Sequence, residues 1–313
     1  MTEHHPALLL VGHGSRDAAG VDQYWKLADL VRRLRPHLTL GCGFIELARP
    51  DLDTAIDDLV DRGVTSVIAV PLVLLGAGHL KTDGPAALSR GRARHADVDF
   101  TYGRDLGIHP AVLAVAEERI RAAQDGEAAS DPRPAAGLGP PPLGGGRGWD
   151  PARGGEAASD RAVALVGRGS TDPDANADLY KVGRLLSDSR GLGMVEPAFV
   201  SLARPSVTDA LDRCRQLGAT SVAVVPYFLF TGLLVDRIRR QARSWADLHP
   251  DVTVTAGSEL GPDDRVARLV IERYDEARSG GAFMNCDCCI YRTVLPGYEH
   301  RVGAPVAGAS HTH

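Results

Sequence analysis

The stretch "LLLVGHGSRD" (Leu8–Asp17) recurs later in the chain as "VALVGRGSTD" (Val163–Asp172), and this repeat is the strongest indication of the fold. The same separation of 155 positions relates "FIELARP" to "FVSLARP", and "GVTSVIAVPLVLLGAGHL" to "GATSVAVVPYFLFTGLLV". A constant offset over three separate stretches means that the two halves are homologous and aligned without internal gaps. We therefore predict two copies of one domain.

Each half alternates short, β-branched apolar runs with longer amphipathic ones, which is typical of strands and helices in turn. Pro50 and Pro205, each followed by a polar residue, suit the first turn of the following helix. Alternating strands and helices imply a parallel sheet with helices on both faces. The fold class predicted is α/β, with two tandem, doubly wound parallel-sheet domains facing across a cleft. In the first half the expected strands lie within 7–12, 38–47, 66–75 and 98–103, and the expected helices within 20–34, 50–62, 80–95 and 110–124.

The composition of the 313 residues fits a globular, water-soluble protein, with 44% hydrophobic and 24% charged residues. No run of eighteen apolar residues occurs, so we expect no membrane span and no membrane partner. The start lacks the basic region and cleavage site of a signal peptide, so we expect a cytoplasmic protein. A net charge of -5 argues against a nucleic-acid partner.

Composition also divides the chain. A stretch rich in Gly, Pro and Ala separates the halves and reads as a flexible linker. We predict an active first domain over 1–124, a linker over 125–160, a degenerate second domain over 161–279 and a tail over 280–313.

Comparing the two copies separates the needs of the fold from those of chemistry. Both copies keep "G-x-G-S" and "LARP", which we interpret as parts of the fold. Three polar residues are lost together in the second copy: His13 becomes Arg168, Glu46 becomes Ser201, and His79 becomes Leu234. On the predicted topology, each of the three follows the carboxyl end of a different strand, where open parallel sheets bind ligands.

Two imidazoles and one carboxylate suit a divalent transition metal such as Co, Fe, Ni or Zn, with coordination positions left open. His13, His79 and Glu46 are therefore the predicted metal-binding and catalytic residues. Arg49 recurs as Arg204, which favours a structural role for it.

At this point the motifs resemble a known family. "GHGSRD", "ELARP", the histidine after "VPLVLLGAGH" and the later "LGIHP" resemble the sirohydrochlorin chelatases, the ATP-independent class of metal chelatases in cobalamin and sirohaem biosynthesis. Long, duplicated members of that family carry "M-x-C-x-x-C" near the C-terminus, present here as Met284, Cys286 and Cys289.

The resemblance implies a lyase-type chelatase that inserts Co2+, or alternatively Fe2+, into the tetrapyrrole sirohydrochlorin, with the metal as substrate. His13 and His79 would hold the metal, and Glu46 would ligate it or accept pyrrole protons. The substrate carries many carboxylates, so we expect Ser15, Arg16 and Lys81 to bind it. No "GxxxxGK[ST]" phosphate loop occurs, so no nucleotide cofactor is expected.

The tail holds three cysteines within four positions, Cys286, Cys288 and Cys289. Thiolates at this spacing can bind an iron-sulfur cluster or a soft metal, although one chain offers fewer than the usual four ligands. The duplication removes the need for a dimer without forbidding one, so both a monomer and a homodimer stay open.

Two other functions fit parts of the pattern. One is a non-catalytic metal carrier or sensor that uses His13, His79 and the cysteines. The other is a phosphate-transferring enzyme of the histidine-phosphatase type, although Gly12 stands where its "RHG" triplet needs arginine.

Overall fold

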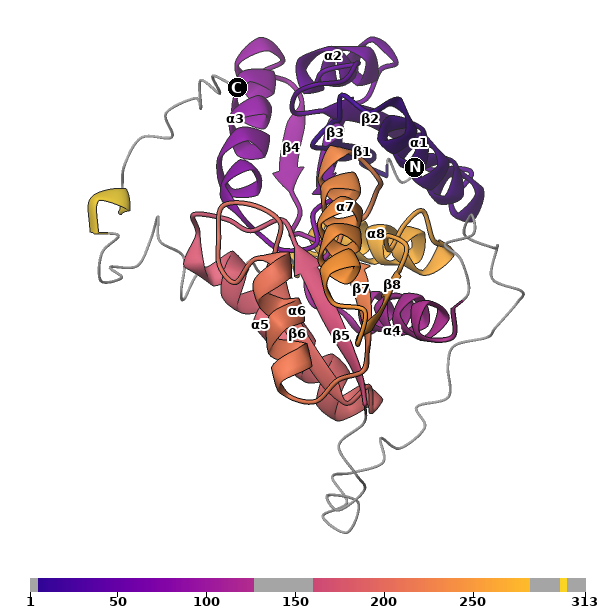
Figure 1. Ribbon diagram of the computed structural model, residues 1–313. Coiled ribbons are helices and arrows are strands. Elements are labelled where there is room, and N and C mark those ends of the chain that lie inside the picture. The colour runs from indigo at the N-terminus through magenta and orange to yellow at the C-terminus, as the bar shows by residue number, and fades with distance from the viewer. Residues whose placement is uncertain (1–4, 127–159, 282–298, 303–313) are drawn as a thin grey trace.

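The computed structural model describes residues 5–126, 160–281 and 299–302. In these ranges the chain forms two four-stranded, all-parallel sheets with strand orders β2-β1-β3-β4 and β6-β5-β7-β8. Each strand pair of the first sheet therefore has its counterpart in the second (Figure 1). The prediction of two repeated parallel α/β domains is confirmed, whereas the cleft between them stays a prediction.

The elements alternate as the sequence predicts, and each expected strand and helix of the first half is present. The first half consists of β1 (Ala7–Gly12), α1 (Ala18–Leu34), β2 (Leu40–Phe44), α2 (Leu52–Asp61), β3 (Ser66–Pro71), α3 (Gly78–Arg94), β4 (Asp99–Tyr102) and α4 (Pro110–Gln124). The second consists of β5 (Arg161–Gly167), α5 (Pro173–Arg190), β6 (Met194–Phe199), α6 (Val207–Gln216), β7 (Ser221–Pro226), α7 (Leu233–Leu248), β8 (Thr253–Ala256) and α8 (Asp264–Arg278). A short 3-10 helix, η2 (Glu299–Arg301), lies beyond them.

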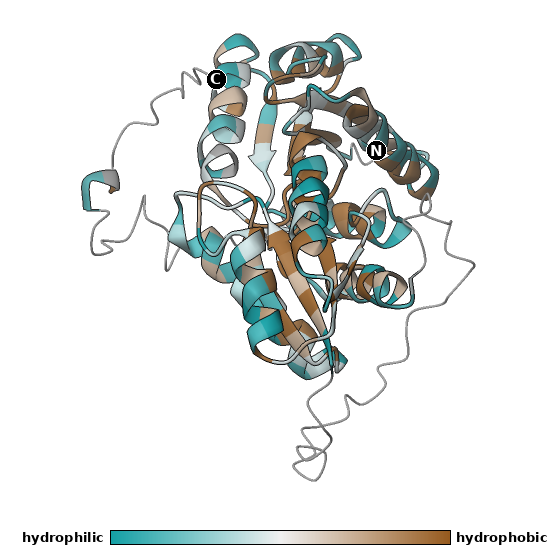
Figure 2. Cartoon of the chain, in the orientation of Figure 1, coloured by the Kyte–Doolittle hydropathy of each residue, from teal (hydrophilic) through white to brown (hydrophobic). Residues whose placement is uncertain are grey.

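Both faces of each sheet are buried, because successive strand residues point to opposite faces. In β1, Leu8 and Leu10 belong to a large inner core, whereas Leu9 and Val11 belong to an outer core with α2 and α3. The central strands of the second sheet, β5 and β7, are mostly brown, whereas the helices carry teal residues beside brown ones (Figure 2). The inner core includes residues of both halves, so the two sheets share one apolar interior.

The last helix of each half packs against the other half. Helix α8 contacts β3 and α1 of the first half, and α4 contacts β7, β8 and α5 of the second (Figure 1). Arg273 of α8 donates hydrogen bonds to the carbonyls of Asp105 and Leu106, at 3.0 Å each. Each sheet is therefore completed by a helix from the other half of the sequence.

One local prediction was wrong. Pro50 and Pro205 do not lie in the first turn of a helix: α2 and α6 begin two residues later, and the polar residues after the prolines are the N-caps. Asp51 accepts a hydrogen bond from the Thr54 amide at 2.9 Å, and Ser206 forms a capping box with Asp209. Each of the two helices therefore starts directly after its capping residue, and the proline is the residue before that cap.

Within the described ranges, no helix is both long enough and apolar enough to cross a lipid bilayer.

Candidate functional site

The residues lost in the second copy follow three neighbouring strands of the first sheet. His13 directly follows β1, Glu46 lies two residues after β2, and position 79 lies in the first turn of α3, which follows β3. Strand β1 pairs with β2 on one side and with β3 on the other. The three positions are therefore at the carboxyl edge of the sheet, beside the point where the strand order reverses.

The loop after β1 is docked on the loop after β2 through their backbones. The amide of Glu46 donates to the His13 carbonyl at 3.0 Å, and that of Ile45 donates to the Gly12 carbonyl at 2.8 Å. Gly14 has φ +95°, and a Cβ built on it would lie 1.8 Å from the Glu46 carbonyl oxygen. The docking therefore needs glycine at position 14.

The second half repeats this docking. Gly169 has φ +86°, and a Cβ there would lie 1.9 Å from the Ser201 carbonyl oxygen. The Ser201 amide donates to the Arg168 carbonyl at 3.0 Å. Both copies keep "G-x-G-S" and "LARP" because these two motifs form the paired loops, whichever side chains the loops carry.

His13 and Glu46 face each other across the docked loops. His13 Nε2 lies 3.5 Å from Glu46 Oε1, and the side chains are 31% and 33% exposed. The Nε2 atom itself is buried, so the carboxylate of Glu46 covers it and has to move aside for a metal to bind there. The other ring nitrogen, Nδ1, lies 3.3 Å from the Gly14 carbonyl oxygen. A proton on Nδ1 donates to that carbonyl and leaves the lone pair on Nε2, which is the form that binds a metal.

The structure gives only part of the predicted ligand set. The backbone of His79 is in α3, but its side chain is outside what the structure describes. Among the described side chains, no group of three His, Cys, Asp or Glu residues is placed to hold a metal ion. The third ligand stays a prediction, as do the roles of Cys286, Cys288 and Cys289, which lie outside the described residues.

The corresponding positions of the second half carry no metal-binding pair. Arg168 is exposed and Ser201 is half-buried. Leu234 packs against the outer core of its own half, together with Phe228. Leucine has no atom that can ligate a metal, and this half-buried side chain packs against apolar neighbours, so the position contributes to the fold in the second copy.

The three predicted substrate-binding residues have different surroundings. Ser15 Oγ accepts a hydrogen bond from the Asp17 amide at 3.0 Å, and Arg16 is exposed. Lys81 is 11% exposed, and its Nζ lies 2.6 Å from Asp172 Oδ2 in the second half. Arg49, for which the repeat favours a structural role, is 82% exposed and pairs with Asp51.

Gln23 of α1 joins the two halves, and no sequence pattern pointed to it. Its Oε1 accepts a hydrogen bond from the Thr231 amide at 2.7 Å, and its Nε2 donates to Glu259 at 2.9 Å. A Cβ on Gly20 would lie 2.6 Å from the Thr231 carbonyl oxygen. The start of α1 therefore rests directly on the loop before α7.

The motif "LGIHP" has a structural role at α4 and α8, the exchanged helices, each of which packs against the other half of the chain. His109 is the N-cap of α4, and its Nδ1 accepts a hydrogen bond from the Ala111 amide at 3.2 Å. Its Nε2 lies 3.3 Å from Glu272 Oε1 of α8, and burial lowers the pKa of the imidazole. His109 thus links the two helices that cross between the halves.

Two half-buried carboxyl groups lie near each other at the same interface. Burial raises the pKa of Asp105, three residues after β4, to about 6, despite the positive charge of Arg104. Burial and the neighbouring Asp174 also raise the pKa of Asp178 in α5. These two acids bind protons more readily than exposed carboxylates do.

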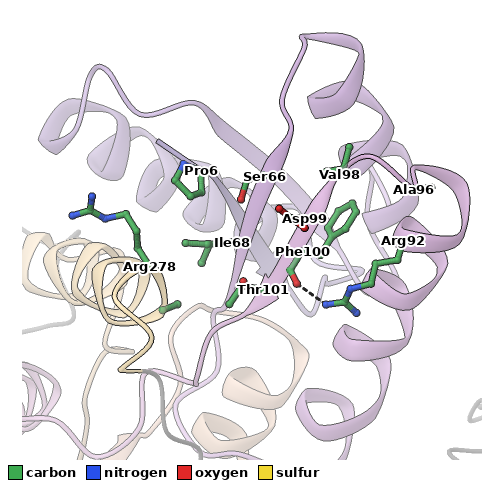
Figure 3. A pocket seen from close by; sticks show the side chains of 11 residues that line it. Pro6, Ser66, Ile68, Arg92, Ala96, Val98, Asp99, Phe100, Thr101 and Arg278 are labelled. Carbon is green, nitrogen blue, oxygen red and sulfur yellow. Dashed lines mark hydrogen bonds between the residues drawn. The ribbon is translucent and has the colours of Figure 1, made fainter. Parts of the chain in front are cut away.

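A separate hollow of about 530 Å3 lies at the opposite end of the first sheet (Figure 3). Pro6, Ser66 and Asp99 line it where β1, β3 and β4 begin, together with Arg92 and Arg278. Arg92 donates to the Phe100 carbonyl at 2.5 Å. Among the predicted site residues whose side chains the structure describes, none lines this hollow.

Comparison with known proteins agrees with this arrangement. The sequence model of the CbiX family matches residues 7–123 and 162–277. A sirohydrochlorin cobaltochelatase of Priestia megaterium is 32% identical over 286 residues, which are 91% of this chain and 84% of that protein. A sirohydrochlorin ferrochelatase of Bacillus subtilis (strain 168) is 28% identical over 280 residues, 88% of this chain and 94% of that protein.

Solved structures extend the similarity to the whole fold. SirB from Bacillus subtilis with Fe3+ superimposes with a TM-score of 0.68 at 27% identity, and the match covers 89% of this chain and 98% of that one. The sirohydrochlorin chelatase SirB from Bacillus subtilis subspecies spizizenii in complex with cobalt gives a TM-score of 0.64 at 25% identity, over 88% and 96% of the two chains. Both repeats match the family model and the fold matches along most of the chain, so this protein belongs to the CbiX family.

Proposed function

We propose that this protein is a sirohydrochlorin chelatase that inserts a divalent metal into the tetrapyrrole without nucleotide hydrolysis. The observation that carries the proposal is the pair of His13 and Glu46, 3.5 Å apart at the carboxyl edge of the first sheet and replaced in the second copy. Relatives that span most of the chain bear the names of cobalt- and iron-inserting chelatases.

The chemistry required is a metal exchange for two protons. A divalent metal enters the macrocycle as the two pyrrole N–H groups lose their protons, so the products are the neutral metal centre and two H+. Neutral His13 and His79 would hold the metal by imidazole nitrogens. Glu46 would balance the charge of the metal and accept a pyrrole proton, since a nearby cation favours deprotonation of the nitrogen.

A tetrapyrrole with many carboxylates needs hydrogen-bond donors and cations around the site. Ser15 and Arg16 lie in the loop that opens α1, next to His13, and Arg16 is exposed. An exposed guanidinium can bind a carboxylate in bidentate fashion, so we assign these two residues to the tetrapyrrole side chains. The ammonium group of Lys81 already contacts two carboxylates of the second half.

Cobalt is the metal we favour, in cobalamin biosynthesis. The chain resembles the long, cysteine-tailed chelatases, and the cobaltochelatase relative is 32% identical to it. Imidazole and carboxylate ligands also accept Fe2+, so the sirohaem branch is the competing assignment.

Several further assignments go with this proposal. One chain supplies both halves, so a monomer is sufficient, and a homodimer would be needed only for a tail cluster shared between two chains. The domain division at 124, 160 and 279 follows the repeat, and the cytoplasm is the expected compartment. Cys286, Cys288 and Cys289 are assigned to an iron-sulfur cluster or a soft metal.

The test is anaerobic absorbance of sirohydrochlorin mixed with Co(II) or Fe(II), with and without the protein, in the absence of ATP. A chelatase accelerates the spectral change of metal insertion above the protein-free rate. A carrier binds the metal without accelerating insertion, and a phosphatase-type enzyme instead forms a phosphoenzyme on His13. Either of those two outcomes would contradict the proposal.

A further inference from the structure

A buried ion pair ties the helix that carries His79 to the second half. Lys81 Nζ lies 2.6 Å from Asp172 Oδ2 and 3.6 Å from Asp174 Oδ2. The Lys81 side chain is 11% exposed and that of Asp172 is 2% exposed. Charges this well buried persist only when they are paired, so the contact is part of the fold and not a surface pair.

The local sequence does little to fix the start of α3. Its N-cap is Ala77, with no side-chain cap, its first residue is Gly78, and its first turn holds no acidic residue. A cation in the first turn also opposes the helix dipole, and Lys81 is the fourth residue of the helix. Lysine is therefore locally unfavourable at this position, and its partner in the second half accounts for its presence.

The partner is well suited to this task. Asp172 is the N-cap of α5, and its Oδ1 accepts a hydrogen bond from the Asp174 amide at 3.1 Å while its Oδ2 faces Lys81. Both carboxylate oxygens are thus engaged, one in the cap and one in the bridge. The equivalent of Lys81 in the second half is Asp236 of α7, an acid that suits a helix N-terminus by itself.

We propose that Asp172 is a positioning residue for metal insertion, which holds the first turn of α3, and with it His79, through Lys81. The amide of Lys81 closes that turn by donating to the Ala77 carbonyl at 3.2 Å, so anchoring its side chain fixes the rotation of the turn. The inference rests on the proposed function. It means that the second half, which has lost the metal ligands, still helps to position a metal ligand of the first half. It makes Lys81 a positioning residue instead of a substrate-binding one.

The experiment uses Asp172→Asn, Lys81→Met and the double variant in the full chain. Asparagine is also a good N-cap, so Asp172→Asn removes the shorter of the two ion pairs of Lys81 and leaves the cap of α5. Two quantities are measured: Co(II) affinity in the absence of tetrapyrrole, by absorbance titration, and KM and kcat for sirohydrochlorin. Asp263→Asn is the matched control, because Asp263 is also a buried N-cap that bridges the halves, through Arg119 at 3.4 Å, without contacting α3.

We expect each single variant to lose about 10- to 100-fold in Co(II) affinity, with little change in KM for sirohydrochlorin. The double variant recovers part of the loss, because neither Lys81 nor Asp172 is then left buried without the other. Asp263→Asn lowers the melting temperature and leaves Co(II) affinity unchanged. If Asp172→Asn does not fold, Lys81→Met and the double variant decide the question.

Co(II) affinity at the wild-type level in Asp172→Asn and Lys81→Met would overturn the inference. So would a rise in KM for sirohydrochlorin confined to Lys81→Met, which would make Lys81 a substrate ligand. The proposed function fails differently: wild-type protein then binds Co(II) without accelerating insertion, and the affinities of the variants still test the positioning role.

Discussion

Asp105 should make the stability of the folded protein depend on pH. Burial disfavours the charged form of this carboxyl and raises its pKa from the ordinary 3.8 to about 6. Between these two pH values the folded chain keeps a proton that the unfolded chain has released. Raising the pH through this window therefore removes stability from the folded state, by about 2–3 kcal/mol for a shift of this size.

We expect Asp105→Asn to abolish this contribution. Relative to the variant, the wild type should lose about 2–3 kcal/mol of unfolding free energy between pH 4 and pH 7. Urea unfolding of both proteins at the two pH values measures the difference, and contributions of other groups cancel in it. Parallel losses in both proteins would show that Asp105 is not the group responsible.

The sequence predicted individual residues where the repeat offered a comparison. His13 and Glu46 stood out because Arg168 and Ser201 replace them, and the structure brings these two side chains together. Gln23 and Asp172 gave no such signal, since their roles depend on contacts more than 80 positions away in the sequence. Such contacts follow from the packing of the halves, which no local pattern encodes.

At the scale of elements, the paired glycines allow a matched test. Gly14→Ala and Gly169→Ala both place a Cβ within 2 Å of a carbonyl oxygen, at positive φ. Each should lower the unfolding free energy by about 2–3 kcal/mol, because the docked loops must separate. Only Gly14→Ala should also weaken Co(II) binding, since only its loops carry His13 and Glu46.

Urea unfolding and Co(II) titration of the two variants check this expectation. Equal loss of Co(II) affinity in both would mean that the second pair of loops contributes to the metal site.

The order of strands and helices was predictable because apolar periodicity is a local property. The start of α2 was not placed correctly, since a proline is compatible with both the first helical turn and the residue before the cap. The capping hydrogen bond of Asp51 decides between them, and only the structure shows that bond.

At the scale of the whole molecule, the exchanged helices make the halves depend on each other. Leu269 of α8 is 1% exposed and belongs to the inner core that includes residues of both halves. We expect Leu269→Ala to cost about 2–4 kcal/mol and to lower the stability of both halves together. Tryptophan fluorescence can follow each half separately, through Trp25 in α1 and Trp245 in α7.

Trp149 is the third tryptophan of the chain, and Trp149→Phe removes its fluorescence. In that background, a variant that keeps only Trp25 and a variant that keeps only Trp245 should unfold at the same denaturant midpoint, both with and without Leu269→Ala. Two separate midpoints would mean that the halves fold independently. The sequence predicted two repeats and not this exchange, because a repeat shows which segments are homologous and not which of them pack together.

On the proposed function, the chain inserts metal with the first copy of the repeat and has lost that chemistry in the second. The most direct measurement is the rate of Co(II) insertion into sirohydrochlorin, without ATP, for repeat-matched variants: His13→Ala against Arg168→Ala, and Glu46→Gln against Ser201→Ala. We predict that the first member of each pair loses at least about 100-fold in rate, as expected when a metal ligand or its base is removed, and that the second stays close to wild type. Equal losses within the pairs, or no loss in His13→Ala, would contradict the account.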